Sequence, residues 1–345
     1  MFAHASVMLL VLLFAAGVAV VWVAGHALST TTDALDDRFG FGQALGGSIF
    51  LAIATNLPEI AITLAAAIAL HFDLAIGNIL GGIAIQTVVL AILDFVVMRR
   101  KAAPLTTAAA SLVIVIQACA LVAILTLAIQ GTLMPKSLIW LHVTPATAGI
   151  AIVWMLGILL ANKASEGLPW TTRAAERTRE AGDAAAKPLA ITVAVFAVAA
   201  VATLGAGWLL EEASTALALQ WHMTGALFGA TILAAATSLP ELTTGLTAVK
   251  MGDYELAISD IIGGNAFLPV LFLMATLVSG RAVLPDAHPT DVYLAGLGIL
   301  LTMVYAFGAV FRSKHRILGM GLDSAAVVLI YLVGIAGLLA FPAHG

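Results

Sequence analysis

Two glutamates are the residues of this sequence whose position best suits chemistry. Glu59 and Glu241 each lie deep inside a long apolar stretch, far from either end, and each directly follows a proline, Pro58 or Pro240. These stretches and the ones that follow them contain no Lys or Arg except Lys250, near an end. A carboxylate so far from a polar boundary is costly in a membrane unless it is paired, protonated or facing water. We therefore expect a cation, a proton or neutral donors to satisfy the two carboxylates, with a cation or proton site favoured.

Small oxygen-bearing side chains surround each glutamate. Thr55 and Asn56 precede Glu59, and Thr237 and Ser238 precede Glu241. Hard cations such as Ca²⁺ take about six to eight oxygen ligands and mix carboxylates with hydroxyls and carbonyls. Thr and Ser hydroxyls also bond back to their own helix, which is the structural alternative for each of them.

The two prolines predict a break in each helix. Proline lacks a backbone N–H and clashes with the carbonyl four residues earlier, which here belongs to Ala54 or Ala236. Freed backbone inside a membrane is tolerated where it lines a cavity or binds an ion. A plain kink is the alternative, but two equivalent prolines beside two glutamates favour the functional interpretation.

The elements that position these residues are membrane-spanning helices. Of 345 residues, 62% are hydrophobic and only 10% are charged, with a mean hydropathy of +1.09, whereas soluble domains carry about 25% charged residues. This composition excludes a soluble enzyme, a nucleic-acid binder and a disordered chain. Apolar runs near the length that crosses a bilayer predict an all-α protein with ten spans, at about 5–28, 43–70, 74–98, 107–130, 138–161, 189–210, 225–250, 254–279, 291–311 and 322–342.

Basic residues predict the orientation of these spans. If both termini face outside, the inner loops hold 13 of the 15 Lys and Arg residues, and the outer loops hold only Lys136 and Arg281. Positive charge concentrates on the cytoplasmic side of membrane proteins. The longest polar stretch, 162–187, is then a cytoplasmic linker between a first half, 1–161, and a second half, 188–345.

An internal repeat relates the two halves. Sliding the chain along itself lays 44–88 over 226–270 without a gap, with 20 of 45 positions identical. The shared blocks include "TNLPE" with "TSLPE", and "LAIGNILGGIA" with "LAISDIIGGNA". Five spans separate equivalent helices, so the copies are inverted in the membrane, as in many secondary transporters with a midplane site.

The third and eighth spans add polar candidates beside paired glycines. Gln86 lies one turn beyond Gly82, a position that allows it to point toward Glu59. Asp260 lies four residues before Gly264, and Asn265 directly follows that glycine. Asp260 is either a third acid of the pathway or a residue nearer the interface. The glycines permit close helix packing and expose backbone to an ion.

Two further polar residues have ordinary explanations. His71 falls in the short connection between the second and third spans, where we expect a solvated loop residue. Asp94 is close to Arg99 and Arg100, so we expect an ion pair near the end of a span.

The two "T-x-L-P-E"-like blocks resemble the α-repeats of the calcium/cation antiporter superfamily, in particular its prokaryotic sodium/calcium exchanger-like members. Each block is followed, in the next span, by a block similar to "G-N-x-x-G-S-N". The resemblance also includes ten spans, external termini and a cytoplasmic loop between the halves. It implies antiport, with Glu59 and Glu241 as shared ligands and the motif positions Thr55, Asn56, Thr237 and Ser238 around them.

This sequence departs from the family pattern at four positions. The family's motif serines fall on Gly82 and Gly264, and a polar residue of the second repeat falls on Leu268, whereas its counterpart in the first repeat is Gln86. Asp260 stands where the family usually has Asn. These departures remove small oxygen ligands, which bears on the ion and on the stoichiometry.

We expect a secondary-active antiporter, most simply one that exchanges Ca²⁺ against Na⁺ in a bacterial or archaeal cell membrane. The candidate ligands are Glu59, Glu241, Thr55, Asn56, Thr237, Ser238, Gln86, Ala54, Ala236, Asp260 and Asn265. A proton-coupled exchanger for Ca²⁺, Na⁺ or Mg²⁺ is the nearest alternative. A lipid-phosphate enzyme would need a basic or nucleophilic group beside the glutamates, and a passive channel would show conductance without coupling. Inorganic cations and lipid are the expected partners, with no resident cofactor and no nucleic acid, and the oligomeric state stays open.

Overall fold

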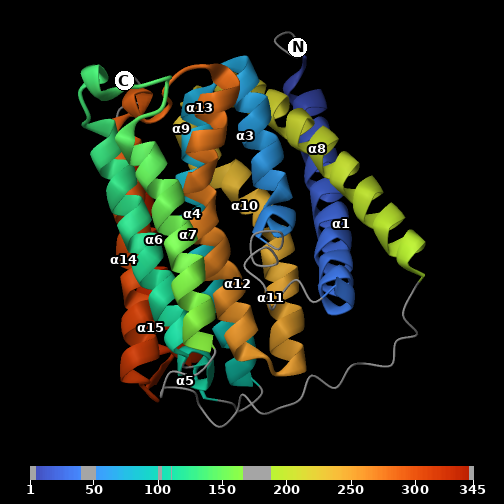
Figure 1. Ribbon diagram of the computed structural model, residues 1–345, viewed down its shortest axis with the longest axis vertical. Helices are drawn as coiled ribbons and strands as arrows, with labels where there is room; N and C mark the ends of the chain where they lie inside the picture. Colours follow the sequence, from blue (N-terminus) through green and yellow to red (C-terminus); the bar gives the residue numbers. More distant parts are fainter. Residues whose placement is uncertain (1–4, 40–51, 100–102, 110, 166–187, 342–345) are drawn as a thin grey trace.

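The computed structural model describes residues 5–39, 52–99, 103–109, 111–165 and 188–341, most of which are helical (Figure 1). Within this part of the chain, nine helical runs are long and apolar enough to cross a membrane: Val7–Thr32, Phe72–Arg99, Leu112–Thr132, Pro145–Ala164, Leu189–Gln220, Gly225–Met251, Tyr254–Ser279, Pro289–Phe311 and Leu322–Leu339. They match nine of the ten predicted spans. The second predicted span, 43–70, contributes a shorter apolar helix at Leu57–Ala69, and its first residues, 43–51, lie outside the described residues.

The helices of the first half are α1 (Val7–Phe39), α3 (Leu57–Ala69), α4 (Phe72–Arg99), α5 (Leu105–Ala109), α6 (Leu112–Thr132), η2 (Lys136–Leu138) and α7 (Pro145–Ser165). Helix α7 continues past the predicted start of the linker to Ser165. The remaining linker residues, 166–187, lie outside the described residues.

Several spans of the second half are built from consecutive short helices. Its elements are α8 (Leu189–Gln220), α9 (Gly225–Phe228), the π-helix η4 (Gly229–Leu233), α10 (Ala234–Thr237), α11 (Leu239–Met251), α12 (Tyr254–Phe267), η5 (Leu268–Val270), α13 (Leu271–Ser279), η6 (Leu284–Asp286), α14 (Pro289–Phe311), β1 (Arg316–Ile317), β2 (Met320–Gly321) and α15 (Leu322–Leu339). The strands β1 and β2 form an antiparallel hairpin.

Helices α1 and α8 are longer than predicted. They contain 33 and 32 residues, or about 50 Å at 1.5 Å per residue, whereas the hydrocarbon core is ~30 Å thick. The polar residues that close the predicted spans stay helical because their side chains find local partners. Thr31, for example, donates to the carbonyl of Ala27 at 2.6 Å.

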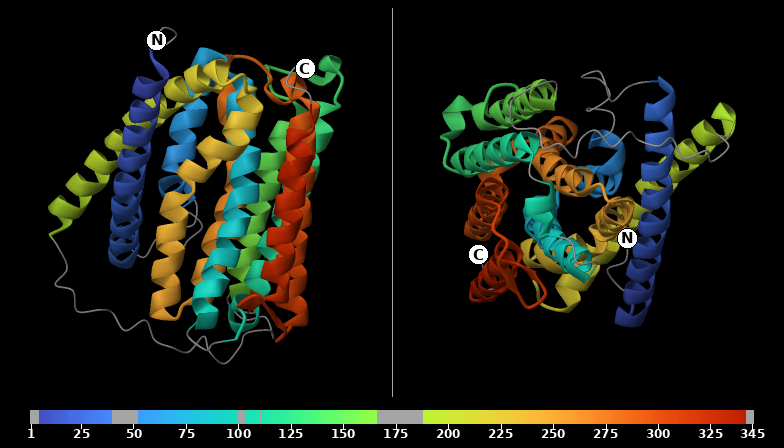
Figure 2. Two further views of the ribbon diagram at one scale, coloured as in Figure 1. Left: turned by 180° about the vertical axis from the view of Figure 1, so that it is seen from behind. Right: turned by 90° about the horizontal axis from the view of Figure 1, so that it is seen from below.

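These two long helices lie side by side at one edge of the bundle (Figures 1 and 2). Only 22% of the apolar window of α1 is buried, against 72% of the corresponding window of α4. Helix α4 is therefore the central helix, and α1 presents most of its apolar surface outward. Helix α1 begins and α15 ends at the same end of the bundle, which we call the N-terminal face (Figure 1).

Glycines allow close approach to α4. A Cβ atom on Gly77 or Gly81 would collide with the backbone of Ala226 or Ala230. Small residues permit helix backbones to approach in a membrane, where van der Waals contact drives much of the packing. Helix α4 therefore sits directly against α9 and η4, beside the span that carries Glu241.

Among the described residues, Asp94 bonds to backbone amides and not to Arg99, and Arg100 lies outside the described residues. The Asp94 carboxylate, fully buried, accepts hydrogen bonds from the backbone amides of Leu105 at 2.7 Å and Gly321 at 2.6 Å. Arg99 instead lies over the ring of Phe95, 4.8 Å from its centroid. Asp94 thus anchors α5 and the β-hairpin to α4, because amides in these tight turns have no partner within their own segment.

Candidate functional site

Two helix breaks place the glutamates. Asn56 (φ −94°, ψ 20°) and Ser238 (φ −83°, ψ 2°) leave the helical conformation, and α3 and α11 begin at the next residue. The breaks confirm the interruption predicted from Pro58 and Pro240, each the second residue of its helix. Glu59 and Glu241 thus occupy the first turns of two helices, where the helix dipole favours negative charge.

Side chains at each break turn back onto one carbonyl of their own helix. In the first copy, the Asn56 amide donates to Ala52 at 2.8 Å and Thr55 lies 3.5 Å from the same oxygen. In the second copy, Ser238 donates to Ala234 at 2.7 Å and Thr237 lies 3.3 Å from it.

These hydrogen bonds use the donors of the side chains and leave their oxygen lone pairs available to a cation. The carbonyls that gather the polar groups belong to Ala52 and Ala234, two residues before the predicted Ala54 and Ala236. Bonding of Ser and Thr to carbonyls three or four residues earlier is the signal that identifies them.

The two carboxylates lack hydrogen bonds at most of their oxygens. Glu59 is 1% exposed and neither carboxylate oxygen has a hydrogen-bond partner; Glu241 is 9% exposed and its Oε2 has none. The two carboxylates repel each other electrostatically, and Thr237 lies beside Glu59. The ion pairs that the structure shows among the described residues, His71–Glu211 and Arg281–Asp286, do not involve either glutamate.

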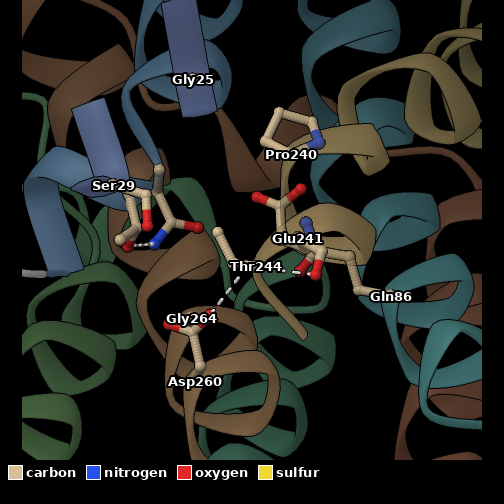
Figure 3. A pocket seen from close by; sticks show the side chains of 10 residues that line it. Gly25, Ser29, Gln86, Pro240, Glu241, Thr244, Asp260 and Gly264 are labelled. Carbon is tan, nitrogen blue, oxygen red and sulfur yellow. Dashed lines mark hydrogen bonds between the residues drawn. The ribbon is translucent and has the colours of Figure 1, made fainter. Parts of the chain in front are cut away.

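A small polar cavity adjoins Glu241 (Figure 3). Its volume is about 20 Å³, which is room for one water molecule or one dehydrated cation. Thr244 donates to Asp260 Oδ2 at 3.3 Å across it, and the Gln86 amide nitrogen has no partner. The lining residues are Gly25, Ser29, Thr55, Asn56, Gln86, Pro240, Glu241, Thr244, Asp260 and Gly264.

Five of the predicted site residues therefore line one cavity: Thr55, Asn56, Gln86, Glu241 and Asp260. Ser29 and Thr244 were missed, because a lone hydroxyl on an amphiphilic helix carries no spacing signal. Asn56 contacts the face of Gly264 that a methyl group would occupy. Because Gly264 stands where the family pattern has a serine, no side chain lies between this position and the Asn56 amide.

The other predicted residues do not line the cavity: they are Glu59, Thr237, Ser238, Ala54, Ala236 and Asn265. Asn265, fully buried, donates weakly to the carbonyl of Ile83 and the hydroxyl of Thr87 on α4, both at 3.4 Å. Leu268, also fully buried, faces Gly82.

The arrangement suits exchangeable cations better than a fixed metal. Within the described residues, no three His, Cys, Asp or Glu side chains converge on one point. Two carboxylates with hydroxyl, amide and carbonyl oxygens form the mixed oxygen environment that Na⁺ and Ca²⁺ accept. A helical membrane protein with carboxylates at two mid-helix breaks is of the class that moves ions.

Comparison with known proteins confirms this class and the predicted resemblance. Residues 9–162 and 191–340 match the family described as "Sodium/calcium exchanger protein". The chain belongs to this family, a branch of the calcium/cation antiporters, whose members are membrane exchangers and not enzymes.

Named relatives cover most of the chain. Inner membrane protein YrbG of Escherichia coli (strain K12) is 27% identical over 301 residues, which are 85% of this chain and 86% of that protein. The fold is similar to that of the H⁺/Ca²⁺ exchanger CAX, with a TM-score of 0.65 and 13% identity over 96% of this chain and 88% of that one. It is also similar to the sodium-calcium exchanger NCX_Mj, with a TM-score of 0.59 and 16% identity over 96% and 99% of the two chains.

Proposed function

We propose that the protein is a secondary-active antiporter that exchanges Ca²⁺ against Na⁺ by alternating access to a site built on Glu59 and Glu241. The observation that carries this proposal is the pair of buried carboxylates, three of whose four oxygens have no hydrogen-bond partner. Two unpaired carboxylates in a membrane interior need two positive charges. One Ca²⁺, two Na⁺ or two H⁺ supply them, so these ions compete for the same place.

The proposed ligands combine both helix breaks. Glu59 and Glu241 hold the charge, and the oxygens of Thr55, Asn56, Thr237 and Ser238 complete the shell, as do carbonyls at the breaks. Gln86 and Asp260 lie on the cavity that leads to Glu241. A loaded site is close to neutral, which lowers the cost of moving it through the low-dielectric interior from one access state to the other.

We infer ten crossings in two inverted halves. Helix α1 begins and α15 ends at the same face, which requires an even number of crossings, and α3 with residues 52–55 supplies the tenth. The distribution of Lys and Arg places the N-terminal face outside the cell. The integral membrane location itself agrees with the nine apolar helices.

Transport in sealed proteoliposomes tests the proposal. We expect outward Na⁺ gradients to drive ⁴⁵Ca²⁺ uptake, and Glu59→Gln and Glu241→Gln to abolish it while both variants elute normally on size exclusion. Because neither substitution changes side-chain size, loss of uptake reports lost charge and not lost packing. Uptake that persists in both variants would refute the proposed site.

A proton-coupled exchanger is the second candidate, and the contact between Leu268 and Gly82 favours it. Both positions lack the oxygen that the family pattern places there, so fewer ligands remain for several Na⁺ ions. The same vesicles decide between the two: uptake driven by a pH gradient alone, with no need for Na⁺, supports proton coupling. If neither gradient moves Ca²⁺, the vesicles should be tested for Na⁺/H⁺ and Mg²⁺ exchange.

A further inference from the structure

The internal repeat extends beyond the glutamate helices into α1 and α8. The register that aligns the two glutamates also lays residues 7–38 over 189–220, and it pairs Gly25 with Gly207 and Ser29 with Glu211. Gly25 and Ser29 line the cavity beside Glu241. Their counterparts in the second half therefore mark where an equivalent cavity beside Glu59 would lie.

The residues that line the cavity and their counterparts in the other repeat copy differ in solvent exposure. Of the cavity residues, Ser29, Thr55, Thr244, Asp260 and Gly264 are half-buried. Their counterparts are all buried: Glu211, Thr237, Ile62, Asn78 and Gly82. The two sets occupy equivalent positions of the repeat but differ in side-chain chemistry at three of the five pairs, and they differ in solvent exposure. We call the half-buried set open and the buried set closed.

The closed set contains polar groups without partners. Asn78 is 0% exposed, and neither its amide nitrogen nor its amide oxygen has a hydrogen bond. The hydroxyl of Thr63, one turn beyond Glu59 on α3, is likewise buried and unpaired. A buried polar group without a hydrogen bond destabilises the folded state. A conformation that hydrates these groups or places them against an ion would satisfy them.

Three hydrogen-bonded side chains, His71, Glu211 and Thr215, lie between the rest of the closed set and the N-terminal face. His71, at the turn between α3 and α4, holds the buried carboxylate of Glu211 through Nδ1 at 2.5 Å. Thr215 lies 3.2 Å from the same carboxylate oxygen. His71 is partly exposed, as expected of a loop residue, but its contact with a buried carboxylate was not predicted. Below this group, α8 touches α3 so closely that a Cβ on Gly207 would collide with Ala61.

We propose that Asn78 and Thr63 line a second ion route, from Glu59 to the N-terminal face, and that the His71–Glu211 pair closes it in this conformation. Glu211 stands where the open route has Ser29, so it meets the ion as an additional carboxylate once His71 releases it. The inference rests on the proposed alternating access, because a one-sided binding protein has no use for a second route.

Side-resolved cysteine labelling tests the route. Cys119 is the only cysteine, so Cys119→Ser provides the background, into which Asn78→Cys is introduced. Thr302→Cys is the control, a buried polar residue on α14 that donates to the carbonyl of Gly298 and is not among the candidate ligands. The probe is a membrane-impermeant cationic methanethiosulfonate, applied to intact cells and, separately, to inverted vesicles.

We expect Asn78→Cys to react from the N-terminal face only, at least tenfold faster than Thr302→Cys, and His71→Ala to raise that rate several-fold further. Glu211→Gln should act in the same direction, which guards against a folding defect in either single variant. The proposed route is wrong if Asn78→Cys reacts no faster than the control whether His71 and Glu211 are intact or replaced by His71→Ala or Glu211→Gln. It is also wrong if Asn78→Cys reacts only from the opposite face. Labelling does not depend on the ion, so a failed Ca²⁺ assay with the expected labelling contradicts the proposed ion and not the route.

Discussion

Glu59 and Glu241 lie close enough to repel each other electrostatically, and each follows a helix break that sets what the side chain contributes. Both sit in the first turn of a helix, where the helix dipole offsets part of the cost of burial. The dipole cannot replace a counter-charge, because it stabilises a carboxylate by ~0.3–2 kcal/mol, whereas the desolvation of that carboxylate costs several kcal/mol. A bound cation or proton would therefore supply the charge that the helix dipole does not.

The two glutamates should contribute unequally to affinity. Asp260 adds negative charge near Glu241, whereas the counterpart of Asp260 beside Glu59 is the neutral Asn78. We expect Asp260→Asn to raise the apparent KM for Ca²⁺ about three- to tenfold with the maximal rate largely retained, since the change removes attraction without removing a central ligand. Initial rates of ⁴⁵Ca²⁺ uptake over a range of concentrations measure this. Complete loss of transport in Asp260→Asn would instead place Asp260 among the central ligands.

Leu268 should limit the number of coupled charges. It lies beside Gly82 where the family pattern has a polar residue, so Leu268→Asp adds a third carboxylate that needs a third positive charge. We expect the number of Na⁺ or H⁺ exchanged per Ca²⁺ to rise by one, as measured by the ion gradient that just stops net flux. Leu268→Asn is the uncharged control and should leave the ratio unchanged. An unchanged ratio in Leu268→Asp would show that position 268 is remote from the ions.

Sequence reasoning reached the charged residues of the candidate site and some of its neutral side chains, namely Thr55, Asn56 and Gln86, but it missed Ser29 and Thr244. A glutamate deep in an apolar stretch is visible because its cost demands an explanation, and duplication doubles the signal. Ser29 and Thr244 are ordinary helix residues whose role depends on which helices meet. Likewise, the carbonyls of Ala52 and Ala234 are singled out by side-chain rotamers, which spacing does not determine.

Helix α4 shows how elements position the site. It carries Gln86 and packs against the spans of both glutamates, and its glycines set the distance to η4. The sequence predicted the span and its paired glycines. It did not predict the lengths of α1 and α8, because residues such as Glu211 look like a span boundary until a partner in another segment is known.

Gly81→Ala should destabilise the bundle. The added methyl group meets the backbone of Ala230, which cannot move away as a flexible side chain does. We expect a loss of about 1–3 kcal/mol, as for overpacked cores, seen as a lower thermal midpoint in detergent. Gly205→Ala is the matched control, because its new methyl group meets nothing within 4 Å. Equal midpoints for the two variants would contradict the close packing of α4 on η4.

Asp94→Ala should weaken the end of the bundle opposite the N-terminal face without changing ion affinity. It leaves two buried backbone amides, of Leu105 and Gly321, without an acceptor, at about 1–3 kcal/mol each. Asp94→Asn keeps one acceptor oxygen and should lie between the wild type and Asp94→Ala in thermal midpoint. A change in the KM for Ca²⁺ with an unchanged midpoint would show that Asp94 belongs to the ion pathway and not to the scaffold.

At the scale of the whole molecule, the two copies of the sequence repeat differ in exposure. One set of repeat positions lines a cavity and the equivalent set is buried. The copies also differ in sequence, with 20 of 45 positions identical, so both sequence and conformation contribute to the inequality. Composition predicted the membrane class, and the repeat predicted the pairing of halves, but neither could predict which side is open.

Equilibrium binding of ⁴⁵Ca²⁺ to the purified protein is the most direct test of the central claim. The account predicts one Ca²⁺ per chain, displaced by Na⁺ or by protons, and affinity at least 100-fold weaker in both Glu59→Gln and Glu241→Gln. Gly205→Ala, which changes nothing near the site, should bind as the wild type does. Binding that survives in either glutamate variant, or that neither Na⁺ nor acid displaces, would contradict a shared site on these two carboxylates.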